Sequence, residues 1–246
     1  MFPALNADLH PLVRKLESIV DLSDEEKHAV LGIPVTLRDL RPRQDIVRDQ
    51  DRPSQCCLIL DGFAFRYKAL GDGKRQILSF HIPGDMPDLQ SLHIEVMDHS
   101  LATLSTSKVA FIPHDTVWAF IRAHPRIGDV FWRDTLIDAA VFREWVTNMG
   151  RREAYGRIAH LLCELFVRLR AVGLTNGDSY PLPITQAELA DATGLSTVHV
   201  NRTMQELRGD GLIKTNKASV VVKDWDGLRE AGQFDPTYLH FRKHAA

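Results

Sequence analysis

The feature that most limits how this chain can fold is a change of pattern near residue 126. Residues 33–113 are short β-rich runs separated by turn sequences, among them Asp61-Gly62 and Pro83-Gly84-Asp85. Many short strands at close spacing predict a small antiparallel barrel or sandwich. Residues 126–149 contain no proline and carry large apolar side chains at helical spacing. We therefore predict an α+β chain, in which an N-terminal antiparallel β-barrel of jelly-roll type precedes a long helix and a helical C-terminal part.

These patterns divide the chain into three parts. Residues 1–125 are expected to form the barrel and short N-terminal helices, one of which begins with Ser23 and Glu26 at the spacing of a capping box. Residues 126–149 are expected to form the long helix and a hinge, with the break at Asn148-Met149-Gly150. Residues 150–246 are expected to form a second domain.

Composition narrows the class of protein. The chain has 246 residues, of which 44% are apolar, and a formal charge of −2, distributed as +2 over residues 151–246 and −4 over residues 1–150. The positive C-terminal part suits an anionic partner. We find no signal peptide and no apolar run that could span a membrane, and three cysteines without framework spacing are typical of reduced thiols. We therefore expect a cytoplasmic protein that does not associate with membranes.

The predicted long helix is apolar on more than one side. Such a helix must bury more than one side, so we expect one face to lie on the barrel and another on a second subunit. The residues predicted to hold this homodimer together are Ile127, Val130, Ile137, Val141 and Trp145.

Residues 184–222 carry the pattern that points to a function. Thr185 and Glu188 form a predicted capping box, Gly194 stands where a tight turn needs a positive φ, and Ser196 is a predicted N-cap. In the second helix Val200 and Met204 share an apolar face with Leu207. Two short helices joined by a glycine turn are typical of a helix-turn-helix.

The opposite face of this second helix is polar. Hydroxyl, amide and guanidinium groups are those that contact base edges and phosphates, so double-stranded DNA is the predicted partner. The sequence "KTNKASVVV" that follows predicts a hairpin wing whose lysines meet phosphates. The candidate DNA-binding residues are Ser196, Thr197, Val198, His199, Asn201, Arg202, Gln205, Lys214 and Lys217. The alternative is a small helical domain whose second helix has only a solvated face.

The chain resembles the Crp/Fnr family of bacterial transcription regulators. The resemblance rests on "PGD" at residues 83–85, the long helix, and above all "ITQAELADATGLSTVHVNR" at residues 184–202. It implies a homodimer on a palindromic operator, read mainly by Val198, Asn201 and Arg202, with Arg202 contacting guanine. Val198 departs from the glutamate that the family often has there, which implies a different half-site. Activators of the family also contact RNA polymerase.

The resemblance further implies an effector site in the barrel. A count without gaps from Asp85 places the family's Gly-Glu pair at Asp88 and Leu89, and its Arg-Ser pair at His99 and Ser100. Only the serine is kept, so we expect no cyclic AMP binding through the usual contacts, and the effector stays unknown.

The sequence gives little support for a cysteine-based or metal-based sensor. An iron–sulfur cluster needs about four cysteine ligands and the chain has three. Cys163 lies on an apolar helix, where a buried thiol is the plain interpretation and a redox sensor the alternative. The histidines have no tight ligand spacing. We predict no metal and no cofactor.

No catalytic motif is present, so we predict that the chain is not an enzyme. The remaining alternatives are a regulatory or scaffolding module that acts through protein partners, and a redox- or metal-responsive regulator.

Overall fold

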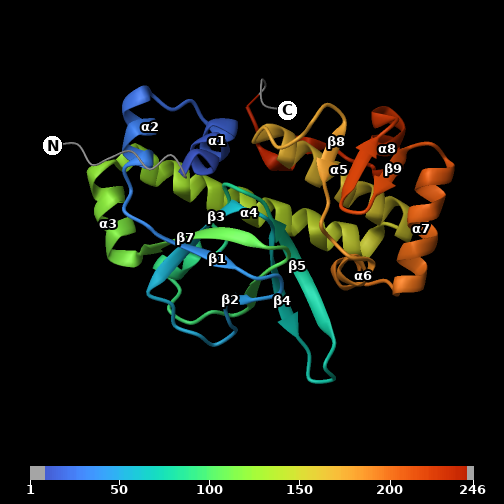
Figure 1. Ribbon diagram of the computed structural model, residues 1–246, viewed down its shortest axis with the longest axis horizontal. Helices are drawn as coiled ribbons and strands as arrows, with labels where there is room; N and C mark the ends of the chain where they lie inside the picture. The colour runs from blue at the N-terminus through green and yellow to red at the C-terminus, as the bar shows by residue number, and fades with distance from the viewer. Residues whose placement is uncertain (1–8, 243–246) are drawn as a thin grey trace. The chain divides into compact units, whose positions relative to one another are not determined.

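The computed structural model describes residues 9–242, which form two compact units (Figure 1). The first comprises residues up to 68 together with 79–138, and the second comprises residues 69–78 and those from 139 onward. In the described part of the chain, no helix is both long and apolar enough to cross a bilayer.

The strands of the N-terminal part form two antiparallel sheets. One has the order β1-β7-β3 and the other β2-β6-β4-β5, so the predicted antiparallel fold is confirmed, with two sheets in place of one closed barrel. The strands are β1 (Thr36–Leu40), β2 (Asp45–Val47), β3 (Gln55–Asp61), β4 (Ala64–Ala69), β5 (Arg75–His81), β6 (Ser100–Thr103) and β7 (Ser107–Pro113). Apolar side chains from both sheets make one core, which includes Cys57, Ile59, Leu101, Val109 and Phe111.

The turn between β3 and β4 shows why glycine follows Asp61. Gly62 has a φ of +80°, and a Cβ atom there would lie 2.4 Å from the carbonyl oxygen of Thr106. A larger residue would therefore meet both backbone strain and a steric clash. The predicted hairpin turn is present at this position.

Three α-helices precede the long helix in the described part of the first unit. They are α1 (His10–Ile19), α2 (Asp24–Leu31) and α3 (His114–Ala123). The capping box predicted at Ser23 is confirmed, because the Ser23 Oγ accepts from the Glu26 backbone N–H at 3.2 Å while the Ser23 N–H donates to the Glu26 carboxylate at 2.8 Å.

The long helix α4 (Pro125–Arg151) confirms the helical pattern but corrects two details. It continues through the predicted hinge at 148–150 and ends at Arg151. The five residues predicted to form the dimer contact are buried within the chain itself, at most 7% exposed, so they face the protein's own core: Ile127, Val130, Ile137, Val141 and Trp145. The large apolar side chains that α4 exposes are Trp132, Leu136 and Val146.

The second unit is mainly helical. It contains α5 (Ala154–Ala171), α6 (Gln186–Thr193), α7 (Thr197–Gly209) and α8 (Trp225–Gly232), the short helix η3 (Pro236–Leu239), and a sheet of order β8-β10-β9 from β8 (Ser179–Pro181), β9 (Ile213–Asn216) and β10 (Ser219–Val222).

A buried carboxylate connects the helices of this unit. Glu164 on α5 is fully buried and accepts hydrogen bonds from Trp145 Nε1 at 3.2 Å, Arg168 Nη1 at 3.2 Å and Tyr238 Oη at 2.8 Å. A buried charge is tolerated when it is paired and hydrogen-bonded. Glu164 therefore holds the C-terminal half of α4, α5 and the C-terminal segment together.

Candidate nucleic-acid interface

The helix-turn-helix forms because each of its local features satisfies backbone groups. The Thr185 Oγ1 accepts from the Glu188 N–H at 3.2 Å, and the Thr185 N–H donates to the Glu188 carboxylate at 2.8 Å, which starts α6. Gly194 then adopts φ +64° and ψ +29°, the left-handed conformation that ends the helix. Ser196 caps α7, where its Oγ accepts from the His199 N–H at 3.2 Å. These predicted caps and turn are confirmed.

The two faces of α7 differ in burial. Val200, Met204 and Leu207 are buried, as predicted, against the small core of the domain. On the opposite face the Val198 residue is 78% exposed, and the Arg202 side chain is 67% exposed. An aliphatic side chain with this exposure gains nothing from the fold and is available to a partner.

The polar groups of this face have few intramolecular partners. Arg202 Nε lies 3.6 Å from Glu206 on the same helix, an exposed pair that constrains the guanidinium weakly. Asn201 Nδ2 donates to Gln186 Oε1 at 3.1 Å. Gln205 is exposed on the next turn. The face therefore presents donors and acceptors that could pair with base edges or phosphates.

The remaining predicted contacts lie at the ends of this surface. Ser196 and Thr197 are exposed at the start of α7, and His199 is half-buried beside them. The predicted wing is the β9–β10 hairpin, in which Lys217 occupies the turn and Lys214 is exposed on β9. Arg208 Nη1 donates to Thr215 Oγ1 at 3.1 Å and so joins α7 to the wing.

Comparison with known proteins agrees with this architecture. The sequence model of the cyclic nucleotide-binding domain family matches residues 37–124, and the sequence model of the Crp-like helix-turn-helix domain family matches residues 156–231. The chain belongs to the Crp/Fnr family. It is therefore a transcription regulator with a DNA-binding helix-turn-helix, and the family is not one of enzymes.

Two relatives and one structure illustrate this membership of the Crp/Fnr family. The chain is 28% identical to the transcriptional activator protein FnrL of Cereibacter sphaeroides over 214 residues, 84% of each chain. It is 23% identical to the nitrogen fixation regulation protein FixK of Azorhizobium caulinodans, over 82% of this chain and 79% of that one. The structure of FixK2 from Bradyrhizobium japonicum has a TM-score of 0.73 and 21% identity, covering 80% of this chain and 97% of that one, and shows the shared fold.

The four effector-site candidates of this Crp/Fnr chain are held by the fold in different ways. Asp88 is buried and accepts from the Cys57 N–H at 2.8 Å, and burial raises its pKa to about 6. Leu89 is buried at the start of the short helix η2 (Leu89–Leu92). Ser100 Oγ accepts from the Asp49 N–H at 3.0 Å. The side chains of Asp88 and Ser100 thus accept hydrogen bonds from backbone N–H groups of the fold.

His99 also lacks the chemistry of an anion clamp. Its Nδ1 pairs with Asp98 Oδ1 at 2.6 Å, and its Nε2 is buried without a hydrogen-bond partner. Burial, and then the charge of Arg66, lower the pKa of His99, which favours the neutral ring. A neutral imidazole provides no charge to balance a cyclic phosphate.

Arg66 is a buried cation in the described part of the first unit, and sequence analysis did not single it out. Its Nε donates to the Pro87 carbonyl oxygen at 2.9 Å, its Nη2 contacts the same oxygen, and its Nη1 donates to Asp138 Oδ2 at 2.6 Å. Burial is the largest influence on the pKa of Asp138 and acts to raise it, but the lowering contributions, of which the Arg66 charge is the largest, together outweigh it, so the pKa is lowered and the carboxyl is ionised. Arg66 therefore joins strand β4 to helix α4 through an internal ion pair.

Arg157 is a second residue that the sequence did not reveal, because a single arginine on an amphipathic helix carries no motif. Its Nη1 donates to the Thr193 carbonyl oxygen at 2.5 Å, and its Nη2 donates to the carbonyl oxygens of Met149 and Arg152, each at 2.9 Å. Thr193 directly precedes Gly194. One guanidinium thus links the end of α4 to the turn of the helix-turn-helix.

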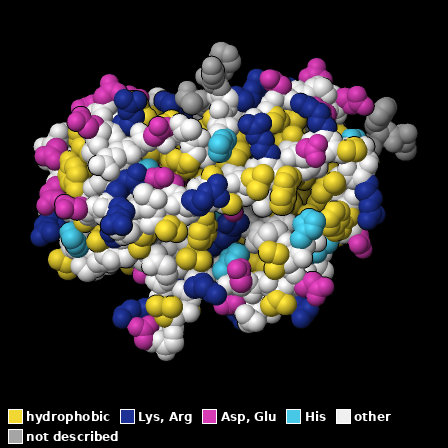
Figure 2. Space-filling view, turned by 180° about the vertical axis from the view of Figure 1, so that it is seen from behind, with side chains coloured by type: hydrophobic (Ala, Val, Ile, Leu, Met, Phe, Trp, Pro, Cys, Tyr) yellow, Lys and Arg dark blue, Asp and Glu magenta, His cyan; other side chains and the backbone are white. Residues whose placement is uncertain are grey.

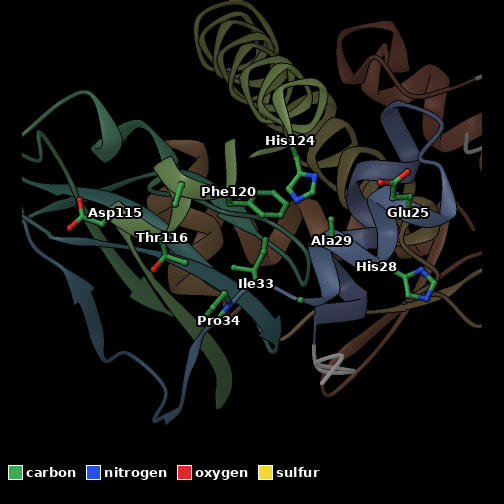
Figure 3. Close-up of a pocket in the computed structure, with 11 residues that line it drawn as sticks. Glu25, His28, Ala29, Ile33, Pro34, Asp115, Thr116, Phe120 and His124 are labelled. Atoms are coloured by element: carbon green, nitrogen blue, oxygen red, sulfur yellow. The ribbon is translucent and has the colours of Figure 1, made fainter. Parts of the chain in front are cut away.

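The first unit also carries an open apolar cavity of about 1060 Å³ between α2 and α3. Figure 3 shows the rings of Phe120 and His124 side by side near Ile33 and Ala29, with the carboxylate of Asp115 turned away from them. The ring centroids of Phe120 and His124 are 4.9 Å apart. None of the described residues that line this cavity is a lysine or arginine, so it suits an apolar ligand better than a phosphate.

The cysteines are poorly placed for redox chemistry. All three are fully buried, and burial raises the pKa of Cys163 to about 12. Because the thiolate is the reactive form, Cys163 has the properties of an inert thiol. Within residues 9–242, no group of three or more His, Cys, Asp or Glu side chains is arranged to hold a metal ion.

Charge alone does not locate the interface. Figure 2 shows lysine and arginine side chains interspersed with acidic ones over one face of the molecule. The candidate interface is therefore defined by the particular groups on α7 and the wing.

Proposed function

We propose that the chain acts in the cytoplasm as a homodimer that recognises a palindromic operator, with α7 of each subunit in a major groove. One observation carries this proposal: α7 buries one face completely and presents Val198, Asn201, Arg202 and Gln205 on the other. A helix that combines guanidinium, amide and aliphatic groups on one exposed face has the chemistry that distinguishes base pairs in the major groove.

The proposed base contacts follow from the exposed groups. Arg202, with only a 3.6 Å partner on its own helix, is free to donate two hydrogen bonds to guanine O6 and N7. Val198 cannot accept a hydrogen bond from cytosine, as a glutamate does, and its methyl groups suit the C5-methyl of thymine. The half-site should therefore differ from that of relatives with glutamate at this position. Ser196, Thr197, His199 and Gln205, with Lys214 and Lys217 of the wing, would contact phosphates or support these residues.

The proposed dimer contact is the exposed side of α4. Trp132 is 60% exposed and Leu136 50% exposed, and the two lie one turn apart on the same face of the helix. Val146, 67% exposed, follows Trp132 by fourteen residues, close to four full turns, and so returns to that face. Large apolar groups with this exposure favour burial against a second subunit.

We propose further that this regulator does not depend on cyclic AMP. The residues at the family's phosphate-binding positions are His99, which lacks a positive charge, and Ser100, which is engaged with Asp49. The Arg66–Asp138 pair supplies a contact between strand β4 and α4 that needs no ligand. Calorimetry with cyclic AMP should show no micromolar binding, whereas a micromolar affinity that is lost on His99→Ala would contradict this part of the proposal.

The experiment that tests the function is selection of reduced, ligand-free protein against a random DNA pool. We expect a two-fold palindrome whose half-sites lie about 34 Å apart, one helical turn. Arg202→Ala should weaken binding by about 1–3 kcal/mol and relax one position of the half-site. Arg229→Ala, which removes an exposed arginine on α8, is the matched control and should change neither.

Two results would contradict the proposal. If the folded wild-type dimer selects no sequence, ligand-free operator binding is wrong. If Arg202→Ala and Asn201→Ala both leave affinity and base preference unchanged, α7 is not the reading element, and a module that acts through protein partners becomes the better description.

A further inference from the structure

Asn201 differs from the other outward side chains of α7 in how it is held. Its Nδ2 donates to Oε1 of Gln186, the first residue of α6, at 3.1 Å. Among the described residues, the other members of the exposed face, Val198, Arg202 and Gln205, have no such bond to a side chain of α6. The preceding helix therefore orients one particular side chain of the exposed face.

Gln186 is itself well anchored. It follows Thr185, whose side chain and backbone N–H are both bonded to the buried Glu188 carboxylate, at 2.7 and 2.8 Å. The backbone of Gln186 is thus fixed at the start of α6. Its side chain is exposed and carries no charge, so the bond to Asn201 is a neutral amide–amide contact that gains strength once a partner excludes water.

The bond to Gln186 limits how many N–H donors Asn201 can offer to a base. An asparagine amide has two N–H groups and one acceptor oxygen. Adenine offers one donor and one acceptor in the major groove, N6 and N7, whereas guanine offers two acceptors, O6 and N7. With one N–H held by Gln186, Asn201 keeps one donor and its oxygen. That set matches adenine and cannot donate twice to guanine.

We infer that Gln186 is a specificity-determining positioning residue, which fixes the amide of Asn201 so that it selects adenine over guanine at one position of each half-site. This inference rests on the proposed function, because it needs α7 to read bases. Gln186 acts on the base through Asn201 and does not itself have to contact DNA.

The test measures dissociation constants for the selected operator and for the same operator with adenine replaced by guanine at each half-site position. Wild type should discriminate by roughly 5- to 150-fold at the Asn201 position. Gln186→Ala should reduce that ratio at least about threefold while leaving the ratios at other positions unchanged. Alanine is a good helix former, so α6 is retained, and circular dichroism checks this.

Two further variants separate positioning from simple attraction. Gln186→Glu keeps an acceptor for Asn201, so it should keep the adenine preference while its charge weakens binding to every sequence by a similar factor. Arg229→Ala, which removes an exposed side chain on α8 away from the proposed interface, should leave the adenine preference intact. In an Asn201→Ala background, Gln186→Ala should no longer change any ratio.

The outcomes are distinct. If Gln186→Ala weakens all operators equally, Gln186 is only a phosphate contact and the inference is wrong. The same conclusion follows if Asn201→Ala changes no base preference although the wild type binds a palindrome. If the wild type binds no specific DNA, the proposed function fails, and the inference fails with it.

Discussion

The internal pair between Arg66 and Asp138 should make a measurable contribution to stability. We consider Arg66→Met, which keeps the length of the side chain but removes its charge, and Asp138→Leu, alone and together. The Arg66 side chain is 7% exposed and that of Asp138 is 36% exposed. The two single variants should therefore lose different amounts of unfolding free energy, because the partner that each leaves unpaired differs in its access to water.

The size of each effect follows from what is left unpaired. Breaking a buried pair by removing one partner costs about 3–5 kcal/mol. Asp138→Leu leaves a deeply buried guanidinium whose remaining described partner is the Pro87 carbonyl oxygen, so its cost should lie in the middle of this range, at about 4 kcal/mol. Arg66→Met leaves a carboxylate that water reaches, so about 3 kcal/mol is expected. The double variant leaves no charge and should cost at least about 2 kcal/mol less than the sum.

The assay is urea unfolding at pH 7, followed by circular dichroism and tryptophan fluorescence. Arg52→Met is the control, since Arg52 Nη1 lies 2.8 Å from Glu95 but both side chains are largely exposed. This control should change the free energy of unfolding by no more than about 0.5 kcal/mol. Additive single effects, or an Arg66→Met variant as stable as the control, would refute the role assigned to the pair.

Two more predictions concern the turn and the response to acid. Gly194→Ala should lower the free energy of unfolding by about 1–2 kcal/mol, because φ is +64° and the new Cβ would lie 2.7 Å from Met149 Cε. The control is Gly177→Ala, where φ is +56° and the new Cβ meets open space, so only the backbone strain of about 1 kcal/mol is expected. Equal losses of the two variants in thermal unfolding would argue against the Met149 contact. Burial, and then the charge of Arg66, lower the pKa of His81 from 6.5 to about 4. The neutral His81 therefore makes its full contribution to the free energy of unfolding above pH 6.5, and this contribution falls by about 3 kcal/mol as the pH drops to 4. His81→Gln should remove that loss of stability in acid. Asp88 acts in the opposite direction, because its pKa is raised to about 6 and its protonation stabilises the fold. The difference in unfolding free energy between wild type and His81→Gln at each pH therefore isolates the effect of His81.

The local features of the helix-turn-helix were accessible from sequence because their causes are local. A capping box joins residues three apart, as in Thr185 and Glu188, and a left-handed turn depends on one glycine, Gly194. The same holds for Ser196, whose partner His199 lies three residues away. Each of these bonds is complete within one turn of helix, so its residues stand next to each other in the sequence.

The dimer surface could not be predicted in the same way. Apolar spacing shows that a helix buries several faces, but it does not show what covers each one. Ile127 and Val130 are covered by the chain itself, whereas Trp132 and Leu136, a few residues away, are exposed. Helical period is identical for the two sets, so only the fold separates them.

Arg66 and Asp138 escaped prediction because they are 72 residues apart and belong to no motif. Asp88 illustrates the converse, since a gapless count placed it at an effector position whereas its side chain bonds to the backbone of Cys57. Long-range pairing depends on how strands and helices meet, and residue spacing carries no record of it.

The exposure of Val198 has a consequence for the chemistry of the operator itself. A valine that reads a methyl group responds to shape, and the C5 position of cytosine acquires the same methyl group when DNA is methylated there. Thymine and 5-methylcytosine would then look alike to this side chain, whereas uracil, which lacks the methyl, would look like unmodified cytosine. Under the proposed contact of Val198 with a thymine methyl group, the regulator would sense the modification state of the DNA at that base pair as well as its sequence.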